Sequence, residues 1–197
     1  SGYAWSSNIG WISFKGANYG VELFGNDFQK YAWSSNIGWI RFDKDVLGTP
    51  PGGGVSGVRL NGSQVEGWAR ACSVFANVLQ SDTPCSGSLK SDSERGGWDG
   101  WISMNGTSPS YGVTHDATSG KLSGFAWGAD VVGWIDFCAD AATGACVTID
   151  SLSVKCTANG SENGGTVNIN NPVTWEASVI SGGVSPFDYT YCWGTGC

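Results

Sequence analysis

Hydrophobic and polar residues alternate along short segments rich in Trp, Ile and Phe. In the first fourteen residues, two such runs flank the polar sequence Ser-Ser-Asn. Alternation over four to six residues, bounded by turn-forming residues, is typical of β-strands joined by tight turns. The abundance of Gly (31 residues) and Trp (11 residues) fits this pattern, because it supplies both turns and aromatic strands. The sequence therefore predicts an all-β protein.

An internal repeat extends this pattern over most of the chain. The ten residues YAWSSNIGWI at positions 3–12 recur unchanged at positions 31–40. Two diverged copies follow, and short Y-G-V or S-G-V segments precede three of the four copies. We therefore expect four tandem three-stranded antiparallel modules. The diverged copies are residues 67–70 with 100–104 and residues 124–127 with 133–137, and the preceding segments are residues 19–21, 56–58 and 111–113.

The two faces of each hairpin differ in character. A turn centred on Asn8 places Trp5 opposite Trp11, which sets the register of the first hairpin. Alternation then puts Ala4 and Ile12 on the other face, and alanine opposes isoleucine in every copy. Because small residues facing large ones form interlocking layers, we expect the Ile/Phe face to be the core.

The Trp face has two interpretations, because its tryptophans alternate with polar residues such as Ser13 and Asp136. In the first, cross-strand Trp pairs stabilise the hairpins and pack module against module. In the second, exposed rings form a platform on which sugars stack. The candidate ligand-binding residues are Trp11, Trp39, Trp101 and Trp134.

The first module lacks its leading strand, and a spare strand follows the fourth module at residues 146–149. If the spare strand fills the vacancy, the domain closes with no exposed edge, as propellers and prisms do. If it pairs instead with a neighbouring molecule, strand addition builds a filament. We favour closure within one chain.

Two further regions depart from the repeat. The third module carries a long insertion that contains Cys72 and Cys85, and insertions in repeat folds often lie on the binding face. From Asp150 the character changes to three sandwich-type strands, near residues 152–156, 173–179 and 187–193. We expect a Gly/Trp repeat β-domain over residues 1–149 and the start of a second domain over residues 150–197.

Two resemblances accompany these regions. The motif G-Y-A-W-S-x-N-I-G-W-I-x-F resembles a repeat of uncharacterised exported proteins of environmental bacteria, which implies a secreted or cell-surface location and brings no activity with it. The segments 173–177, 181–183 and 189–193 resemble bacterial immunoglobulin-like domains of the polycystic-kidney-disease type. That resemblance implies a partial immunoglobulin-like β-sandwich, since a complete one has about seven strands.

The seven cysteines favour disulfides, because no Cys-x-x-Cys pair is present for a metal. We expect two local disulfides, Cys72 with Cys85 and Cys138 with Cys146. In the last segment, strand phase favours Cys192 with Cys197 and a partner for Cys156 beyond the chain; Cys156 with Cys192 is the alternative. Disulfides indicate an oxidising compartment.

Charge and hydropathy exclude several partners. The net charge of −7 and the pI near 4.4 argue against nucleic acid, which requires clustered Lys and Arg. No run approaches the roughly 18 apolar residues of a membrane span, so we expect no membrane insertion in this segment. The first residue is Ser rather than Met, which fits a removed export signal.

The sequence contains few residues in patterns typical of an enzyme active site. The only histidine, His115, precedes Asp116, but no Gly-x-Ser-x-Gly elbow accompanies the pair. We therefore expect no enzyme activity, no cofactor and no metal site. The first hypothesis is an extracellular structural or adhesive surface protein, such as a subunit of a pilus-like filament or a stalk. The alternative is a carbohydrate-binding module, or lectin, whose exposed Trp residues bind surface glycans.

Overall fold

The computed structural model describes residues 1–44, 47–77, 85–139, 146–149, 153–158, 161–162 and 175–181. The chain divides into two compact units, Ser1–Ile149 and Asp150–Cys197. The protein is all-β, as the sequence predicts, and its described helices are single turns. None of these helices is long and apolar enough to cross a bilayer.

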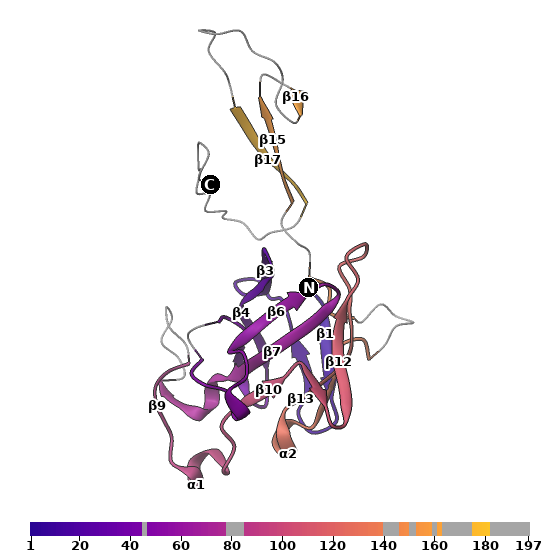
Figure 1. Ribbon diagram of the computed structural model, residues 1–197. Helices are drawn as coiled ribbons and strands as arrows, with labels where there is room; N and C mark the ends of the chain where they lie inside the picture. The colour runs from indigo at the N-terminus through magenta and orange to yellow at the C-terminus, as the bar shows by residue number, and fades with distance from the viewer. Residues whose placement is uncertain are drawn as a thin grey trace. The chain divides into compact units, whose positions relative to one another are not determined.

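Eight strands of the first unit form a closed antiparallel barrel (Figure 1). Each strand pairs with the next along the ring, and the last strand pairs with the first. Four hairpins supply two strands each. In ring order the strands are β1 (Tyr3–Ser6), β2 (Gly10–Ser13), β4 (Asp27–Ser34), β5 (Gly38–Arg41), β7 (Gln64–Ala71), β10 (Trp101–Ser103), β13 (Leu122–Trp127) and β14 (Trp134–Asp136).

The remaining elements of this unit border the barrel. Three strands that precede hairpins pair with β4, β7 and β13, where the Y-G-V and S-G-V segments predict strands. The long insertion lies between β7 and β10. These bordering elements are β3 (Val21–Phe24), η1 (Pro51–Gly53), β6 (Gly57–Asn61), η2 (Cys72–Val74), β8 (Phe75–Asn77), β9 (Ser86–Leu89), α1 (Asp92–Arg95), β11 (Asn105–Thr107), β12 (Ser110–His115) and α2 (Ala129–Val132).

Two layers of large side chains fill the barrel. The four isoleucines at equivalent hairpin positions form one layer, and three phenylalanines with Met104 form the other, each at most 2% exposed. Eight-stranded barrels are just wide enough for side chains to fill. Together the two layers leave a cavity of only about 10 Å³. The layers are Ile12, Ile40, Ile102 and Ile135, and Phe14, Phe42, Met104 and Phe137.

Small residues let these layers approach each other, as the alternation predicts. Ala4 is paired with Ile12 and is fully buried, and the other three hairpins repeat this pair. Phe14 makes edge contacts with Phe42 and Phe137 at centroid distances of 5.5 and 5.4 Å. The expectation that the Ile/Phe face forms the core is confirmed.

The spare strand closes the barrel within the same chain. The N–H of Val147 donates to the Phe137 carbonyl (2.9 Å), and the N–H of Thr148 donates to the Ser1 carbonyl (2.7 Å). A side chain at Gly2, whose φ is +88°, would place its Cβ 2.0 Å from the Cys146 carbonyl oxygen. Residues 146–149 therefore occupy the place beside the first hairpin that the sequence left vacant.

Closure takes the form of one continuous barrel and not of a propeller or prism. Those folds are built from separate sheets, whereas here each hairpin also hydrogen-bonds to its neighbours, as β2 does to β4 and β14 does to β1. The hydrophobic pattern within a hairpin does not specify whether its outer edges pair, and this is the physical reason for the difference.

Both local disulfides form in the first unit, Cys72–Cys85 and Cys138–Cys146, as predicted. Two disulfides are typical of a non-reducing compartment. The side chain of Cys156, together with Cys192 and Cys197, lies outside what the structure describes, so their pairing stays a prediction.

The second unit contains a three-stranded antiparallel sheet. Its order is β16 (Ser161–Glu162), β15 (Ser153–Ala158) and β17 (Trp175–Ser181). The first two predicted sandwich strands overlap β15 and β17, and the third, near residues 187–193, falls outside the described residues. The immunoglobulin-like assignment stays a prediction.

Candidate aromatic binding face

The outer surface of the barrel carries paired aromatic rings. Alternation turns the residues between the core positions outward, so Trp5 stands directly opposite Trp11 at a centroid distance of 4.7 Å. The second hairpin repeats this with Trp33 and Trp39 at 4.6 Å, and the fourth with Trp127 and Trp134 at 4.7 Å. The first two pairs meet edge to face at 65°, a geometry that aromatic rings prefer, and the third pair is tilted at 54°.

A polar residue lies beside each outer aromatic pair. Ser13 is the cross-strand partner of Tyr3, and Asp136 is the partner of both Phe125 and Trp5. The Asp136 carboxylate accepts a hydrogen bond from the N–H of Cys138 (2.9 Å). The outer face therefore combines apolar rings with fixed hydrogen-bonding groups.

The four predicted ligand-binding tryptophans lie on four different hairpins, on β2, β5, β10 and β14, and do not converge on one site. Trp11 is 49% exposed and Trp134 is 40% exposed. Trp39 is partly buried, and Trp101 is only 5% exposed. Equivalent positions in the repeat therefore differ in their access to solvent.

A neighbouring side chain packs on each of Trp39, Trp101 and Trp134, although Trp134 remains 40% exposed. The Tyr19 ring packs edge-on against Trp39 at 5.0 Å, and the Tyr111 ring packs against Trp134 at 4.9 Å. Both tyrosines belong to the segments that precede the respective hairpins. Sequence reasoning identified these segments as strands but missed that they cover a tryptophan.

Trp101 is covered by an arginine. Arg70 takes the place that Trp has in the other hairpins, and its guanidinium lies 4.3 Å from the Trp101 ring and 4.7 Å from the Phe75 ring. It donates to the carbonyls of Leu47 and Asp99. Burial, with a smaller contribution from the charge of Arg95, lowers the pKa of Arg70 to about 10. The insertion is thus anchored over this tryptophan.

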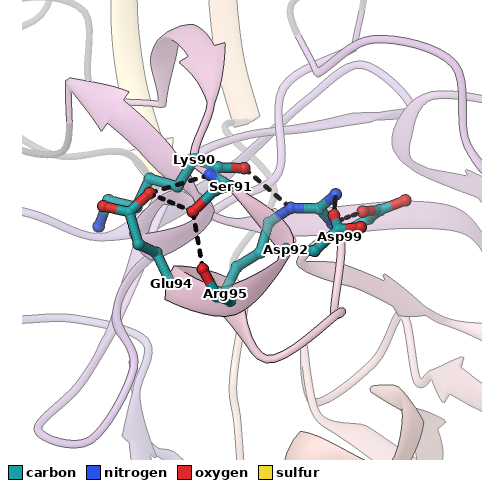
Figure 2. A network of polar contacts seen from close by, with 7 residues as sticks. Lys90, Ser91, Asp92, Glu94, Arg95 and Asp99 are labelled. Atoms are coloured by element: carbon teal, nitrogen blue, oxygen red, sulfur yellow. Dashed lines mark hydrogen bonds and ion pairs between the residues drawn. The ribbon is translucent and has the colours of Figure 1, made fainter.

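The exposed turn of the insertion is held by its own polar contacts. Figure 2 shows Ser91 and Glu94 in a capping box, in which the Ser91 N–H and hydroxyl donate to the Glu94 carboxylate at 3.0 and 2.6 Å. The hydroxyl bond, and to a smaller extent the N–H bond, holds the pKa of the Glu94 carboxyl below its usual value. Arg95 pairs with Asp92 and Asp99. The carboxylates of Asp92, Glu94 and Asp99 thus contact residues of the same turn. That the insertion recognises a ligand stays a prediction.

His115 and Asp116 hydrogen-bond to different partners. His115 is buried, and its Nε2 lies 3.4 Å from the Ile149 carbonyl. The Asp116 carboxylate accepts from the Ser119 hydroxyl (2.7 Å) and the Thr118 N–H (2.9 Å), which lower its pKa. Across the described part of the chain, no group of three His, Cys, Asp or Glu side chains is placed to hold a metal ion.

A polar hollow of about 320 Å³ lies where β3, β4 and β6 meet, and sequence reasoning missed it. It is lined by Asn26, Asp27, Arg59, Leu60 and Asn61. Its charged groups pair nearby: Asp27 with Lys44 at 2.9 Å and Arg59 with Glu66 at 3.5 Å. No pattern in the sequence distinguishes these residues from ordinary turn residues.

Among the residues that the structure describes, the most accessible aromatic group is the Trp11 cluster, defined as Tyr3, Trp5 and Trp11. These residues are 49%, 39% and 49% exposed, and the Tyr3 ring contacts the Trp11 ring at 6.1 Å. The cluster belongs to the adjacent strands β1 and β2 of a rigid barrel. Comparison with known proteins adds no assignment, because no family model, curated protein or solved structure matches this chain.

Proposed function

We propose that this chain is a non-catalytic adhesive protein of the extracellular surface, which binds its partner through the Trp11 cluster. The observation that carries the proposal is the exposure of three neighbouring aromatic side chains on a closed barrel. Exposed groups of aromatic residues mark interaction sites, because leaving them in water costs free energy that binding recovers.

The cellular location is part of this proposal. The two disulfides of the barrel and the acidic net charge of −7 fit a soluble surface in an oxidising medium. The repeat's resemblance to exported bacterial proteins supports the same location. We propose that the protein is secreted or displayed on the cell surface.

An adhesion assay tests the role of the Trp11 cluster. The full chain would be incubated with whole bacterial cells and with insoluble polysaccharides, and the bound fraction measured after sedimentation. Substituting Trp5 and Trp11 together by Ala is expected to lower binding at least tenfold, because the rings supply most of the exposed apolar area.

The matched control is Phe24→Ala. Phe24 is an exposed aromatic side chain in the β3–β4 hairpin, outside the cluster, so its loss should leave adhesion unchanged. Equal retention of the double variant and the parent chain would contradict the proposal. Near-UV circular dichroism would verify that each variant is folded.

A structural role in a filament or stalk is the second candidate. Its support is the equivalence of the four hairpins. In each one, a backbone N–H at the end of the second strand donates to the carbonyl of the residue just before the first aromatic residue of the hairpin, at 3.0–3.1 Å. The donors are Phe14, Phe42, Met104 and Phe137. We propose that they arose from one ancestral three-stranded module, and that the second unit belongs to an immunoglobulin-like sandwich.

Strand addition beside β1 is a poor route to such a filament, since residues 146–149 already occupy that edge. Light scattering on the full chain is therefore expected to give a monomeric mass. Concentration-dependent fibres in electron micrographs would support the filament role and would require a different contact surface.

A further inference from the structure

The first two hairpins provide an internal comparison that singles out Trp11. Both contain the sequence YAWSSNIGWI and place their tryptophans in the same edge-to-face geometry. In the second hairpin, Tyr19 packs over Trp39, whereas Trp11 is half exposed. When Val147 is aligned with Val21, the position of Tyr19 corresponds to Ala145, which has no ring. Trp11 therefore has no covering tyrosine. The third copy also lacks one, because Ser56 holds that position, but there Arg70 covers Trp101.

The size of the exposed area limits the ligand. Aromatic side chains bury 150–250 Å² each, so three rings about half exposed present roughly 300 Å². A stable protein interface needs roughly 800 Å² from each partner. The cluster by itself is therefore smaller than a stable protein interface, and its area suits one or two sugar rings.

The chemistry of the cluster also fits a sugar. A pyranose has one apolar C–H face, which stacks on an aromatic ring, and a rim of hydroxyl groups that require hydrogen-bond partners. The Tyr3 hydroxyl, Ser13 and Asp136 are polar groups in the same cross-strand rows as the rings. Aromatic rings beside hydrogen-bonding groups match both parts of such a ligand.

Charge restricts the class of sugar. The row contains the carboxyl group of Asp136, and the chain has a net charge of −7. Sulfated or uronic acid sugars would be repelled by this field. We infer that the Trp11 cluster binds the apolar face of a neutral pyranose within a surface polysaccharide. This inference rests on the proposed adhesive function, because it names the ligand class of the same site.

Titration with defined oligosaccharides tests the inference. The probes are cellohexaose, chitohexaose and mannohexaose as neutral sugars, and hyaluronan and heparin hexasaccharides as anionic ones. Binding to the full chain would be followed by tryptophan fluorescence and calorimetry. We expect at least one neutral probe to bind with a stoichiometry of one, and the anionic probes to bind at least tenfold more weakly.

Three variants assign the site. Trp11→Ala should lower the affinity for the neutral probe at least tenfold, and Trp11→Phe should retain most of it, because a ring remains. Trp39→Phe, the matched substitution in the identical hairpin, should leave affinity unchanged. The half exposure of Trp11 makes its substitution compatible with folding, which thermal unfolding would verify.

The outcomes separate this inference from the adhesive function. If no neutral probe binds at millimolar concentration while the Trp5/Trp11 double variant still loses adhesion to cells, the sugar inference is wrong and the adhesive function stands. If neutral sugars bind equally well to Trp11→Ala, the assignment to this cluster is overturned. Stronger binding of the anionic probes would overturn the charge argument.

Discussion

The first and second hairpins share ten identical residues, yet they present different surfaces. Inside the barrel they are equivalent: Ile12 and Ile40 are both buried, and Ser6 and Ser34 are both fully shielded from solvent. Outside, Trp39 is packed beneath a tyrosine from the preceding segment and Trp11 is open. Identical sequence thus fixes the hairpin and its core face, whereas neighbouring segments determine which rings remain accessible.

The largest loss of stability should come from substitutions in the core, and it should be equal in the first and second hairpins. Ile12→Ala and Ile40→Ala each remove a buried side chain from the same layer and should each lower the free energy of unfolding by about 2–5 kcal/mol. Guanidinium denaturation of the full chain, followed by tryptophan fluorescence, measures both. A difference between them larger than about 2 kcal/mol would show that the layer is not equivalent around the barrel.

Replacing the buried serines Ser6 and Ser34 should lower stability by different amounts in the two hairpins. The Ser6 hydroxyl donates to the Val132 carbonyl and accepts from the N–H groups of Asn8 and Ile9. Ser6→Ala leaves the buried Val132 carbonyl and Ile9 N–H without this partner, at a cost of about 1–3 kcal/mol. For Ser34 the contact is to the Asn36 N–H at 3.3 Å, and Ser34→Ala should cost less. Equal losses would contradict this ordering.

Replacing Trp39 should lower stability more than replacing Trp11, whereas replacing Trp11 should lower sugar binding more than replacing Trp39. Trp39→Ala removes a ring packed against Tyr19 and should lower stability by about 1–3 kcal/mol. Trp11→Ala removes a half-exposed ring and should cost less than about 1 kcal/mol of stability while lowering the affinity for sugar at least tenfold. Parallel thermal melts and sugar titrations of the two variants test this. Loss of sugar binding in Trp39→Ala but not in Trp11→Ala would contradict this prediction.

The smallest change should make the second hairpin resemble the first. Tyr19→Ala removes the ring that packs on Trp39 and should raise the number of neutral sugars bound from one to two, with a smaller loss of stability than Trp39→Ala. Calorimetry gives the stoichiometry, and Tyr19→Phe, which keeps the ring, is the control. A stoichiometry of one in Tyr19→Ala would show that uncovering the ring is insufficient.

Much of the barrel can be predicted from the repeat. The pairing of Trp5 with Trp11, the burial of Ile12 and Phe14 and the closing position of residues 146–149 all follow from alternation and from counting strands. The disulfides Cys72–Cys85 and Cys138–Cys146 follow from short spacing. These features depend on residues close in sequence or on the internal repeat.

The accessibility of the aromatic face could not be predicted in this way. It depends on Tyr19 and Tyr111 reaching rings of the following hairpins, and on Arg70 stacking on a tryptophan 31 positions later. Such contacts are set by how the strands curve around the barrel, which a pattern of apolar and polar residues does not encode.

The closing strand has a mechanical consequence. The N–H of Thr148 bonds the Ser1 carbonyl, and the amino group of Ser1 bonds the Thr148 carbonyl, so the first unit starts and finishes at adjacent points. Tension applied to the backbone at these two points would act first on this pair of bonds, which would open one after the other. The four hairpins would carry little of the load until residues 147–149 had peeled away from the barrel.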